Sequence, residues 1–391
     1  MGSSSVIRPT PTPRWIVEGG HVPGAIALRH RFDDELGQIG YGVRPSAGPH
    51  LRPAARRNPT QAPAAGRRDA AQQHGIRTGR PATAARRAAD PSGRYGVRVR
   101  ETARGWTAVW LVLLALVQAT ALLLVWRFAV HTRTGQWLDT VALTGNRIGQ
   151  DRIDGPVDSL LNAMSVVSLL VATAVIGFIA LIRGRKTLAV TATLLIAGAN
   201  VSTQLLKHYL VRPDFGIDPE RAVAGNSLPS GHTAVAASVA IALILVLPPK
   251  VRVLGAFLGA GYAAAAGVAT LSAGWHRPSD AVAAFLLVGG WAAVGGLVLL
   301  FFQRDRAEIS PADAHRLAAA LLGLVGVLAL AACGLALAWL TAYSGTPAAE
   351  LGRRPLFIGY AGSAAGIAGT MALVAALVLA VVHRLVPRYK G

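Results

Sequence analysis

The sequence predicts an all-α protein, a polytopic bundle of transmembrane helices. Hydrophobic residues make up 52% of the 391 residues, and they gather in long runs instead of alternating with polar ones. A helix needs roughly 20 apolar residues to cross a bilayer core of about 30 Å. Only helices and closed barrels satisfy every backbone hydrogen bond inside lipid, and runs of this length are helical.

Apolar segments that meet or approach this length lie at residues 107–128, 159–182, 187–206, 232–248, 253–273, 280–302, 317–341 and 360–383. The run at 232–248 is the shortest and ends at Pro248-Pro249, where proline stops a helix because it lacks the N–H donor. We expect three regions: an arm at 1–104, a six-helix membrane domain at 105–305, and a transmembrane hairpin with a short tail at 306–391.

The first 104 residues form a basic segment with 18 Arg, no Lys and 7 acidic residues. They are rich in Pro, Gly and Ala and show no helical or strand periodicity, so we expect this arm to be disordered. A basic arm can rest on anionic lipid headgroups, where each Arg contributes on the order of 1 kcal/mol. No nucleic-acid-binding fold accompanies the charge, so nucleic acid is not an expected partner.

Loop charges predict the orientation of the bundle. Positive charge is in excess in the arm and in alternate loops, namely those with Arg183, Arg185 and Lys186, with Lys250 and Arg252, with Arg304, Arg306 and Arg316, and with Arg384, Arg388 and Lys390. Such loops belong in the cytoplasm. We therefore expect a multi-pass protein of the plasma membrane with a cytoplasmic N-terminus, and with the loops near 131–156, 207–231 and 274–279 outside.

The outer loops carry three polar clusters, each at the end of an apolar segment: Lys207 with Arg212; Ser230, Gly231 and His232; and His276, Arg277 and Asp280. Ionisable groups in a membrane cost free energy unless they are solvated or paired. Taken singly, a lysine can simply reach towards headgroups, and an aspartate can simply stabilise a helix start. Their common level in the membrane indicates a site of chemistry.

The second cluster is suited to binding an anion. The first N–H groups of a helix are unpaired, and the helix dipole there favours negative charge. Gly231 permits close approach of a ligand to the backbone, and Ser230 adds a hydroxyl donor. His232 would stand at the rim of this cradle as a titratable group.

The third cluster supplies a nucleophile and its partner. A carboxylate such as Asp280 can hold one ring nitrogen of His276 and leave the other free as a nucleophile or base. Lys207 and Arg212 add positive charge for phosphoryl oxygens. This set can stabilise charge, attack and protonate a leaving group, as phosphoryl transfer requires. So much positive charge favours an anion over a metal ion, and Cys333, the single cysteine, offers no thiolate cluster; we expect no metal and no cofactor.

These residues resemble the type-2 phosphatidic acid phosphatase superfamily, which carries Lys…Arg-Pro, then Pro-Ser-Gly-His, then Ser-Arg followed by His and Asp. The resemblance spans about residues 107–302 and implies a six-helix phosphatase core, extended here by the C-terminal two-helix hairpin. By position, it implies that His276 forms a phosphohistidine, Asp280 orients it and His232 is the acid and base. Lys207, Arg212, Ser230 and the Gly231 amide would hold the phosphoryl oxygens without a metal.

Two departures from the family pattern stand out. Four residues separate Lys207 from Arg212 where the family has six, which changes the helix face of Arg212 unless the helix ends before Pro213. The Ser-Arg pair is replaced by Ala269-Thr270, so one phosphate-binding arginine is missing. We hypothesise that Arg277 partly fills this gap; the other interpretation is that Arg277 faces lipid headgroups.

The function expected from the resemblance is hydrolysis of a lipid phosphate or diphosphate at the outer face. Polyprenyl diphosphate, phosphatidylglycerol phosphate and phosphatidic acid are candidate substrates, and family analogy does not choose among them. Two alternatives stay open: a headgroup or phosphoryl transferase, and a non-catalytic lipid-binding or transport protein on a degenerate phosphatase scaffold. The sequence indicates no oligomeric state.

Overall fold

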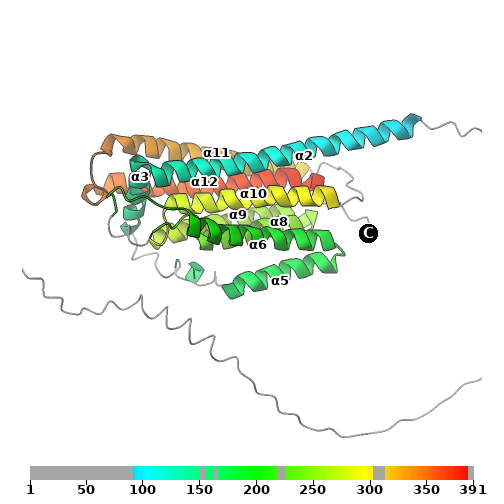
Figure 1. Ribbon diagram of the computed structural model, residues 1–391, viewed down its shortest axis with the longest axis horizontal. Coiled ribbons are helices and arrows are strands. Elements are labelled where there is room, and N and C mark those ends of the chain that lie inside the picture. Colours follow the sequence, from blue (N-terminus) through cyan, green and yellow to red (C-terminus); the bar gives the residue numbers. More distant parts are fainter. Residues whose placement is uncertain are drawn as a thin grey trace, which may run out of the picture. The chain divides into compact units, whose positions relative to one another are not determined.

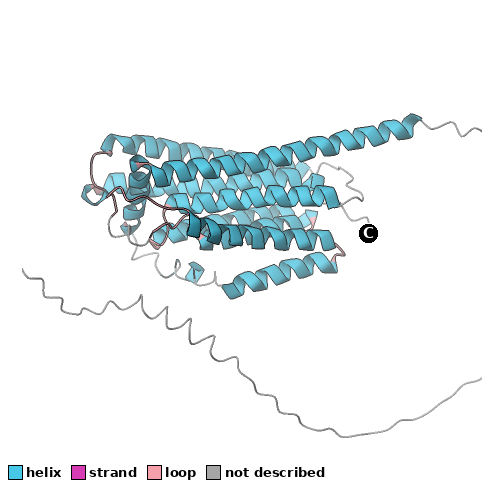
Figure 2. Cartoon of the chain, in the orientation of Figure 1, coloured by secondary structure: helices cyan, strands magenta, loops and turns pink. Residues whose placement is uncertain are grey.

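The computed structural model describes residues 91–148, 155, 157, 159–161, 166–218, 225–302 and 313–385. Within these residues every regular element is a helix, and none is a strand (Figure 2). The predicted all-α class is confirmed. Residues 1–90, most of the expected disordered arm, lie outside the described residues.

The long helices run in a common direction and pack side by side (Figure 1). Each predicted apolar run overlaps one of them. They are α2 (Pro91–Val125), α5 (Val166–Ile182), α6 (Lys186–Tyr209), α8 (Gly231–Val246), α9 (Pro249–Ser272), α10 (Pro278–Phe302), α11 (Asp313–Leu340) and α12 (Arg353–Leu385). The shorter elements are the π-helix η1 (Trp126–Val130), α3 (Arg133–Thr144), and the 3-10 helices η2 (Gly145–Arg147), η3 (Thr341–Tyr343) and η4 (Ala348–Glu350).

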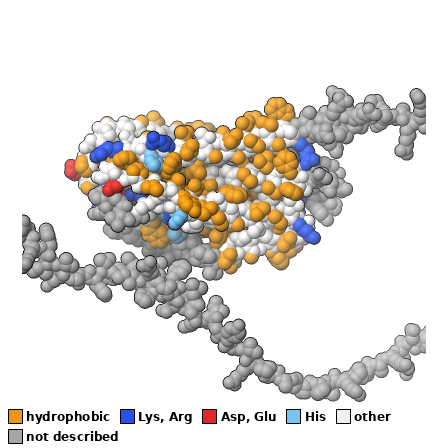
Figure 3. Space-filling model, viewed as in Figure 1, with side chains coloured by type: hydrophobic (Ala, Val, Ile, Leu, Met, Phe, Trp, Pro, Cys, Tyr) orange, Lys and Arg blue, Asp and Glu red, His pale blue; other side chains and the backbone are white. Residues whose placement is uncertain are grey.

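Six of the described helical stretches are long and apolar enough to cross a membrane, so this is a multi-pass membrane protein. They are Arg104–Val130, Lys186–Tyr209, Pro249–Ser272, Pro278–Phe302, His315–Tyr343 and Arg353–Val382. The 16 residues of α8 extend only about 24 Å at 1.5 Å per residue, and α5 is also short, so these two spans stay predictions. Figure 3 shows a broad apolar band along the visible face, with its His and acidic side chains towards the end where α3 lies.

Two boundaries differ from the sequence prediction. Helix α2 begins at Pro91, so residues 91–104, which we assigned to the arm, are helical; proline is favoured in a first helical turn because its missing N–H has no helical partner there. The loop near 131–156 contains α3. Thr132 caps it, because its Oγ1 accepts a hydrogen bond from the Gly135 N–H at 2.9 Å, and this supplies one of the unpaired N–H groups with a partner.

Helix α12 is a core helix, whereas its hairpin partner α11 lies at the periphery. In their most apolar windows, 67% of α12 and 11% of α11 is buried. Small residues permit the close contacts: a side chain on Gly267 of α9 would come within 2.8 Å of Ile367 of α12, and one on Gly369 within 2.9 Å of the Gly326 carbonyl of α11. Small residues let helices approach closely where lipid gives no hydrophobic driving force.

The two arginines Arg183 and Arg252 close the C-terminal end of α8. The buried Arg252 donates from Nε to the Ile244 carbonyl at 3.0 Å and from Nη2 to the Leu247 carbonyl at 2.9 Å. Arg183 donates to the Val246 carbonyl at 2.6 Å. The last carbonyls of a helix have no hydrogen-bond partners within it. These two guanidinium groups supply the missing donors at the end of the bundle opposite α3.

Candidate active site

His276 and Asp280 form a buried pair at the junction of α9 and α10. The chain leaves α9 through Gly274, whose φ of +71° is a left-handed conformation that glycine adopts at little cost. Both Trp275 and His276 then donate their backbone N–H groups to the Thr270 carbonyl. Nδ1 of His276 lies 3.1 Å from Oδ2 of Asp280, which also accepts the Arg277 N–H at 3.0 Å. With Nδ1 held by the carboxylate, Nε2 is left for chemistry.

The segment Ser230-Gly231-His232 begins α8 beside this pair. The Ser230 N–H donates to the Asp280 carbonyl at 2.9 Å, which joins the start of α8 to the start of α10. The ring centroids of His232 and His276 are 6.4 Å apart, and that of His232 is 5.3 Å from Trp275. The structure thus brings both imidazoles to one place, although 43 residues separate them in sequence.

Ser230 and Gly231 differ in how open they are. Ser230 is fully buried, and its Oγ accepts from the Thr233 N–H at 3.4 Å and from the Thr233 hydroxyl at 2.9 Å. It is therefore the N-cap of α8, with only its own hydroxyl proton left to donate. The Gly231 backbone is open, because a side chain there would meet only Gln204 Nε2, at 3.6 Å.

Arg212 follows the end of α6 and turns back towards the site. The helix ends at Tyr209, so the shortened spacing from Lys207 does not fix the helix face of Arg212. Its Nη2 lies 3.5 Å from Asp139 Oδ2 and 3.4 Å from the Ala129 carbonyl, while its Nη1 is buried without a hydrogen-bond partner among the described residues. Burial, and then repulsion from Arg277, lower the pKa of Arg212 below its usual value, but a guanidinium stays charged at neutral pH.

Lys207 lies on the last turn of α6, close enough to His232 for their charges to interact. It is only partly buried, and the structure pairs it with none of the described acidic residues. Lys207 therefore brings a positive charge to the side of the site where His232 stands.

Arg277 lies in a buried polar network. The side chain is buried, and its Nη2 donates to Asp218 Oδ2 at 3.1 Å while Nη1 lies 3.5 Å from Ser227 Oγ. Its Nε is buried without a partner in the described residues. Arg277 is close enough to repel Arg212, so two guanidinium groups converge beside His276.

Thr270 stands where the family pattern has its arginine. The side chain is fully buried, and its hydroxyl donates to the Gly267 carbonyl at 2.8 Å within α9. Thr270 therefore offers no donor to a ligand. Its contribution to the site is its carbonyl, which holds the backbone of His276.

Asp139 of α3 is a site residue that the sequence reasoning missed. Its Oδ2 accepts from the Ser279 hydroxyl at 2.5 Å and lies 3.5 Å from Arg212, and its Oδ1 accepts the Ser279 N–H at 3.3 Å. Burial raises the pKa of Asp139 to about 6, against the opposing effect of Arg212. The sequence offered one signal for Asp139: it is an acidic residue in the loop near 131–156, which the loop charges assign to the same membrane face as the motifs.

The site brings no metal-binding cluster with it. Across the described residues, no group of three or more His, Cys, Asp or Glu side chains could hold a metal ion. The charged groups around His276 are instead mostly cationic, with Lys207, Arg212 and Arg277 against the paired carboxylates. An anion is the ligand that this arrangement suits.

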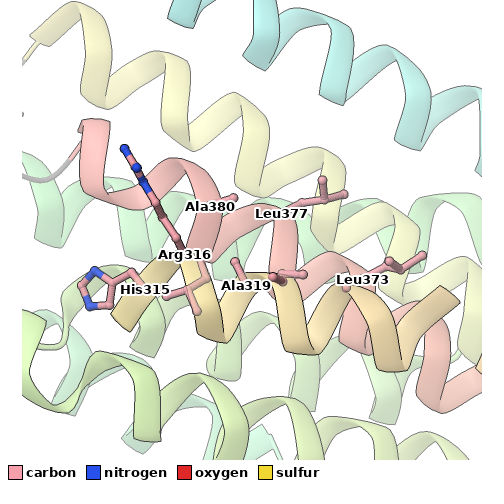
Figure 4. Close-up of a pocket in the computed structure, with 10 residues that line it drawn as sticks. His315, Arg316, Ala319, Leu373, Leu377 and Ala380 are labelled. Atoms are coloured by element: carbon pink, nitrogen blue, oxygen red, sulfur yellow. The ribbon is translucent and has the colours of Figure 1, made fainter. Parts of the chain in front are cut away.

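A cavity of about 480 Å³ lies elsewhere, between α11 and α12 (Figure 4). Its walls are mostly apolar, with His315 and Arg316 at the start of α11. His315 is held by a 3.1 Å contact from Nε2 to the Pro249 carbonyl at the start of α9. Since His276 follows the other end of α9, this cavity is not part of the site.

Comparison with known proteins gives one match. Residues 186–306 match a family model described as the PAP2 superfamily. Neither the curated proteins nor the solved structures gave a match. The matched range begins with α6 and contains the three motifs, and it leaves out α2, η1 and α3, and with them Asp139.

Proposed function

The chain belongs to the type-2 phosphatidic acid phosphatase (PAP2) superfamily through residues 186–306, and from this we propose that it hydrolyses a lipid phosphate or diphosphate through a phosphohistidine. Polyprenyl diphosphate, phosphatidylglycerol phosphate and phosphatidic acid are the candidate substrates. The proposal places the reaction at the outer face of the plasma membrane, as the basic loops at the opposite ends of the helices indicate.

The observation that carries the proposal is the meeting of two imidazoles with two guanidinium groups, each of which keeps one buried nitrogen free of hydrogen bonds to the described residues. The ring centroids of His232 and His276 are 6.4 Å apart, and Arg212 Nη1 and Arg277 Nε are buried donors without partners among the described residues. A buried charged donor left unpaired costs free energy. A bound phosphoryl group would supply acceptors to both arginines.

In the first step, Nε2 of His276 attacks phosphorus while Nδ1 donates to Asp280. A nitrogen–phosphorus bond forms, and the bond from phosphorus to the leaving oxygen breaks. Protonated His232 gives that oxygen its proton. Reacting atoms must approach to about 3–3.5 Å, and two rings with centroids 6.4 Å apart can reach one phosphorus from opposite sides.

In the second step, neutral His232 takes a proton from water, which attacks the phosphohistidine. The nitrogen–phosphorus bond breaks, inorganic phosphate leaves, and His276 is restored. Lys207, Arg212, Arg277 and the Gly231 N–H stabilise the charge on the phosphoryl oxygens in both steps. Ser230 contributes by capping α8 and by the one proton that its hydroxyl has left to donate.

A lipid substrate is supported by the exposed apolar side chains next to the site. Tyr209 and Val211 flank the end of α6, and Trp275 stands beside His232; each has close to half or more of its surface exposed. Apolar groups that border a charged site at the end of membrane helices suit an amphiphile, since tyrosine and tryptophan favour the membrane interface.

A second candidate is a non-catalytic lipid-binding or transport protein, which Thr270 favours. The hydroxyl of Thr270 is committed to its own helix, so one cation of the family pattern has no direct replacement at that position. A headgroup transferase would use the same residues, with an acceptor alcohol in place of water.

The deciding experiment is a substrate panel with purified protein in detergent. Phosphate release from the three lipid classes is measured for the wild type, His232→Ala and His276→Ala. His208→Ala is the matched control, because His208 is an exposed histidine next to Lys207 whose ring contacts Tyr209. The proposal expects release that both site variants lose and the control keeps. Transfer of the phosphoryl group or headgroup to a labelled alcohol, without release of phosphate, supports the transferase. Lipid binding without either reaction supports the non-catalytic alternative.

A further inference from the structure

Helix α3 and the π-helix η1 hold the Arg212-Pro213 segment from outside the family-matched residues. Arg212 Nη2 contacts Asp139 of α3 and the Ala129 carbonyl of η1. Gln136 of α3 donates from Nε2 to the Val130 carbonyl and to the Pro213 carbonyl, each at 2.8 Å. The segment that bears Arg212 is thus fixed on two sides by residues 129–139.

This support is needed because α6 ends too early to orient Arg212. The helix stops at Tyr209, and Leu210 already has extended dihedral angles. An arginine on an extended segment loses more rotamer freedom when it binds than one that is already held, so its grip on a ligand depends on what fixes it. The contacts to residues 129–139 fix the position of Arg212, as a longer α6 would otherwise do.

Asp139 also fixes the start of α10, which carries Asp280 in its first turn. Both of its oxygens accept from Ser279, one from the hydroxyl and one from the N–H. The carboxylate therefore ties Arg212, the anion-binding side chain, to the helix end that holds the His276–Asp280 pair. Because Asp139 contacts Nη2 of Arg212, it leaves for a ligand Nη1, which has no partner in the part of the chain that the structure describes.

We propose that Asp139 is a positioning residue for phosphate binding, which acts by holding Arg212 and the start of α10 in one arrangement. The inference rests on the proposed anion site. It adds a residue of α3 that lies outside the family-matched region and does not itself touch the phosphoryl group.

The charge state of Asp139 gives this role a distinctive pH dependence. The charged groups that face it are Arg212 from the loop after α6, and Arg277 and Asp280 from the start of α10. Burial raises its pKa to about 6, so the carboxylate is charged and paired with Arg212 at pH 8. At pH 5 it is protonated, and the ion pair is lost.

The test compares wild type, Asp139→Asn, Asp139→Glu and Asp214→Asn in the full chain. Asp214 is the matched control, because this exposed aspartate two residues from Arg212 accepts from the Gly216 N–H in a local turn that asparagine also forms. Two readouts are taken between pH 5 and pH 8: thermal stabilisation by inorganic phosphate, and KM with kcat for lipid phosphate. Thermal unfolding without phosphate reports whether each variant is folded.

We expect Asp139→Asn to weaken phosphate binding on the order of tenfold at pH 8, which is the effect of losing one charge-assisted hydrogen bond, with KM raised more than kcat is lowered. The ratio of wild-type to variant affinity should fall towards one at pH 5. All other groups are the same in the two proteins, so the ratio of their affinities isolates the contribution of Asp139. Asp139→Glu, which keeps the charge, should recover part of the affinity.

A ratio that stays the same from pH 5 to pH 8, or equal affinity in the two proteins, overturns the proposal. The proposal is also overturned if Asp139→Asn weakens phosphate binding equally in the wild type and in the Arg212→Ala variant. A residue that acts through Arg212 should have no effect once Arg212 is removed. If Asp139→Asn does not fold, Asp139→Glu is compared with the wild type instead: its affinity for phosphate should lie below the wild-type value at pH 8 and approach it at pH 5, and a ratio that does not change with pH counts against the role. If phosphate stabilises the protein but no lipid phosphate is hydrolysed, the proposed function is wrong. The measurement of phosphate binding then still tests the role of Asp139.

Discussion

Asp280→Asn is the substitution that probes the chemistry of the site most selectively. It preserves the size of a side chain that is fully buried and removes only its charge. The carboxylate Oδ2 is shared between His276 Nδ1 at 3.1 Å and the Arg277 N–H at 3.0 Å. An asparagine oxygen can still accept one of these bonds, but it cannot stabilise the positive charge that His276 gains on phosphorylation.

The size of the effect follows from the contact that changes. A hydrogen bond to a charged group contributes about 1.5–3 kcal/mol, and each 1.36 kcal/mol of barrier is about tenfold in rate. We therefore expect kcat to fall by roughly 10- to 150-fold. KM should change little, because Asp280 is buried behind His276 and contacts no phosphoryl oxygen in the proposed mechanism.

The assay is steady-state phosphate release from a lipid phosphate in detergent, with Asp214→Asn as the control for removing a carboxylate. A folded Asp280→Asn protein with wild-type kcat would refute the assigned role.

Three further substitutions test separate parts of the account. His232→Ala should reduce turnover of lipid phosphates by about 100-fold or more and that of nitrophenyl phosphate by less, because nitrophenolate leaves without a proton; equal losses on both would argue against an acid role. Arg277→Ala should raise KM on the order of tenfold, and an unchanged KM in an active protein would mean that Arg277 serves only Asp218. Arg252→Met leaves the Ile244 and Leu247 carbonyls unpaired and should lower stability by about 2–4 kcal/mol, seen as a lower melting temperature; an unchanged one contradicts the capping role.

Long apolar runs and their polar ends predict most of this fold. Each run became a helix because lipid leaves the backbone no other way to satisfy its hydrogen bonds over that length. The start of α8 could also be predicted, since Ser230 is a favoured N-cap residue immediately before an apolar run. Its early end follows from Pro248-Pro249.

Helix α3 was missed for a physical reason. Its 12 residues are too few for a membrane span, and polar residues such as Gln136, Asp139 and Thr140 interrupt its apolar ones, so no long run marks it. Gln136 and Asp139 are buried where they contact the Arg212-Pro213 segment and Ser279, and the Thr140 hydroxyl donates to the Gln136 carbonyl within α3. Such partners cannot be identified from sequence spacing, since Asp139 and Arg212 are 73 residues apart.

The depth of α12 in the bundle was also beyond sequence reasoning. Helices α11 and α12 are both apolar on every side, so neither shows which face meets protein and which meets lipid. The structure distinguishes them by contacts such as the 2.7 Å hydrogen bond between Tyr360 of α12 and Ser272 of α9. That contact lies four residues before His276, so α12 supports the site from outside the family-matched region.

The central claim is that His276 becomes phosphorylated during turnover. The most direct measurement is a rapid quench in base, which preserves phosphohistidine, after mixing the protein with a lipid phosphate labelled on phosphorus. The account predicts label on His276 in the wild type, none in His276→Ala, and unchanged labelling in His208→Ala. Continued phosphate release by His276→Ala, or label on a different residue, would contradict it.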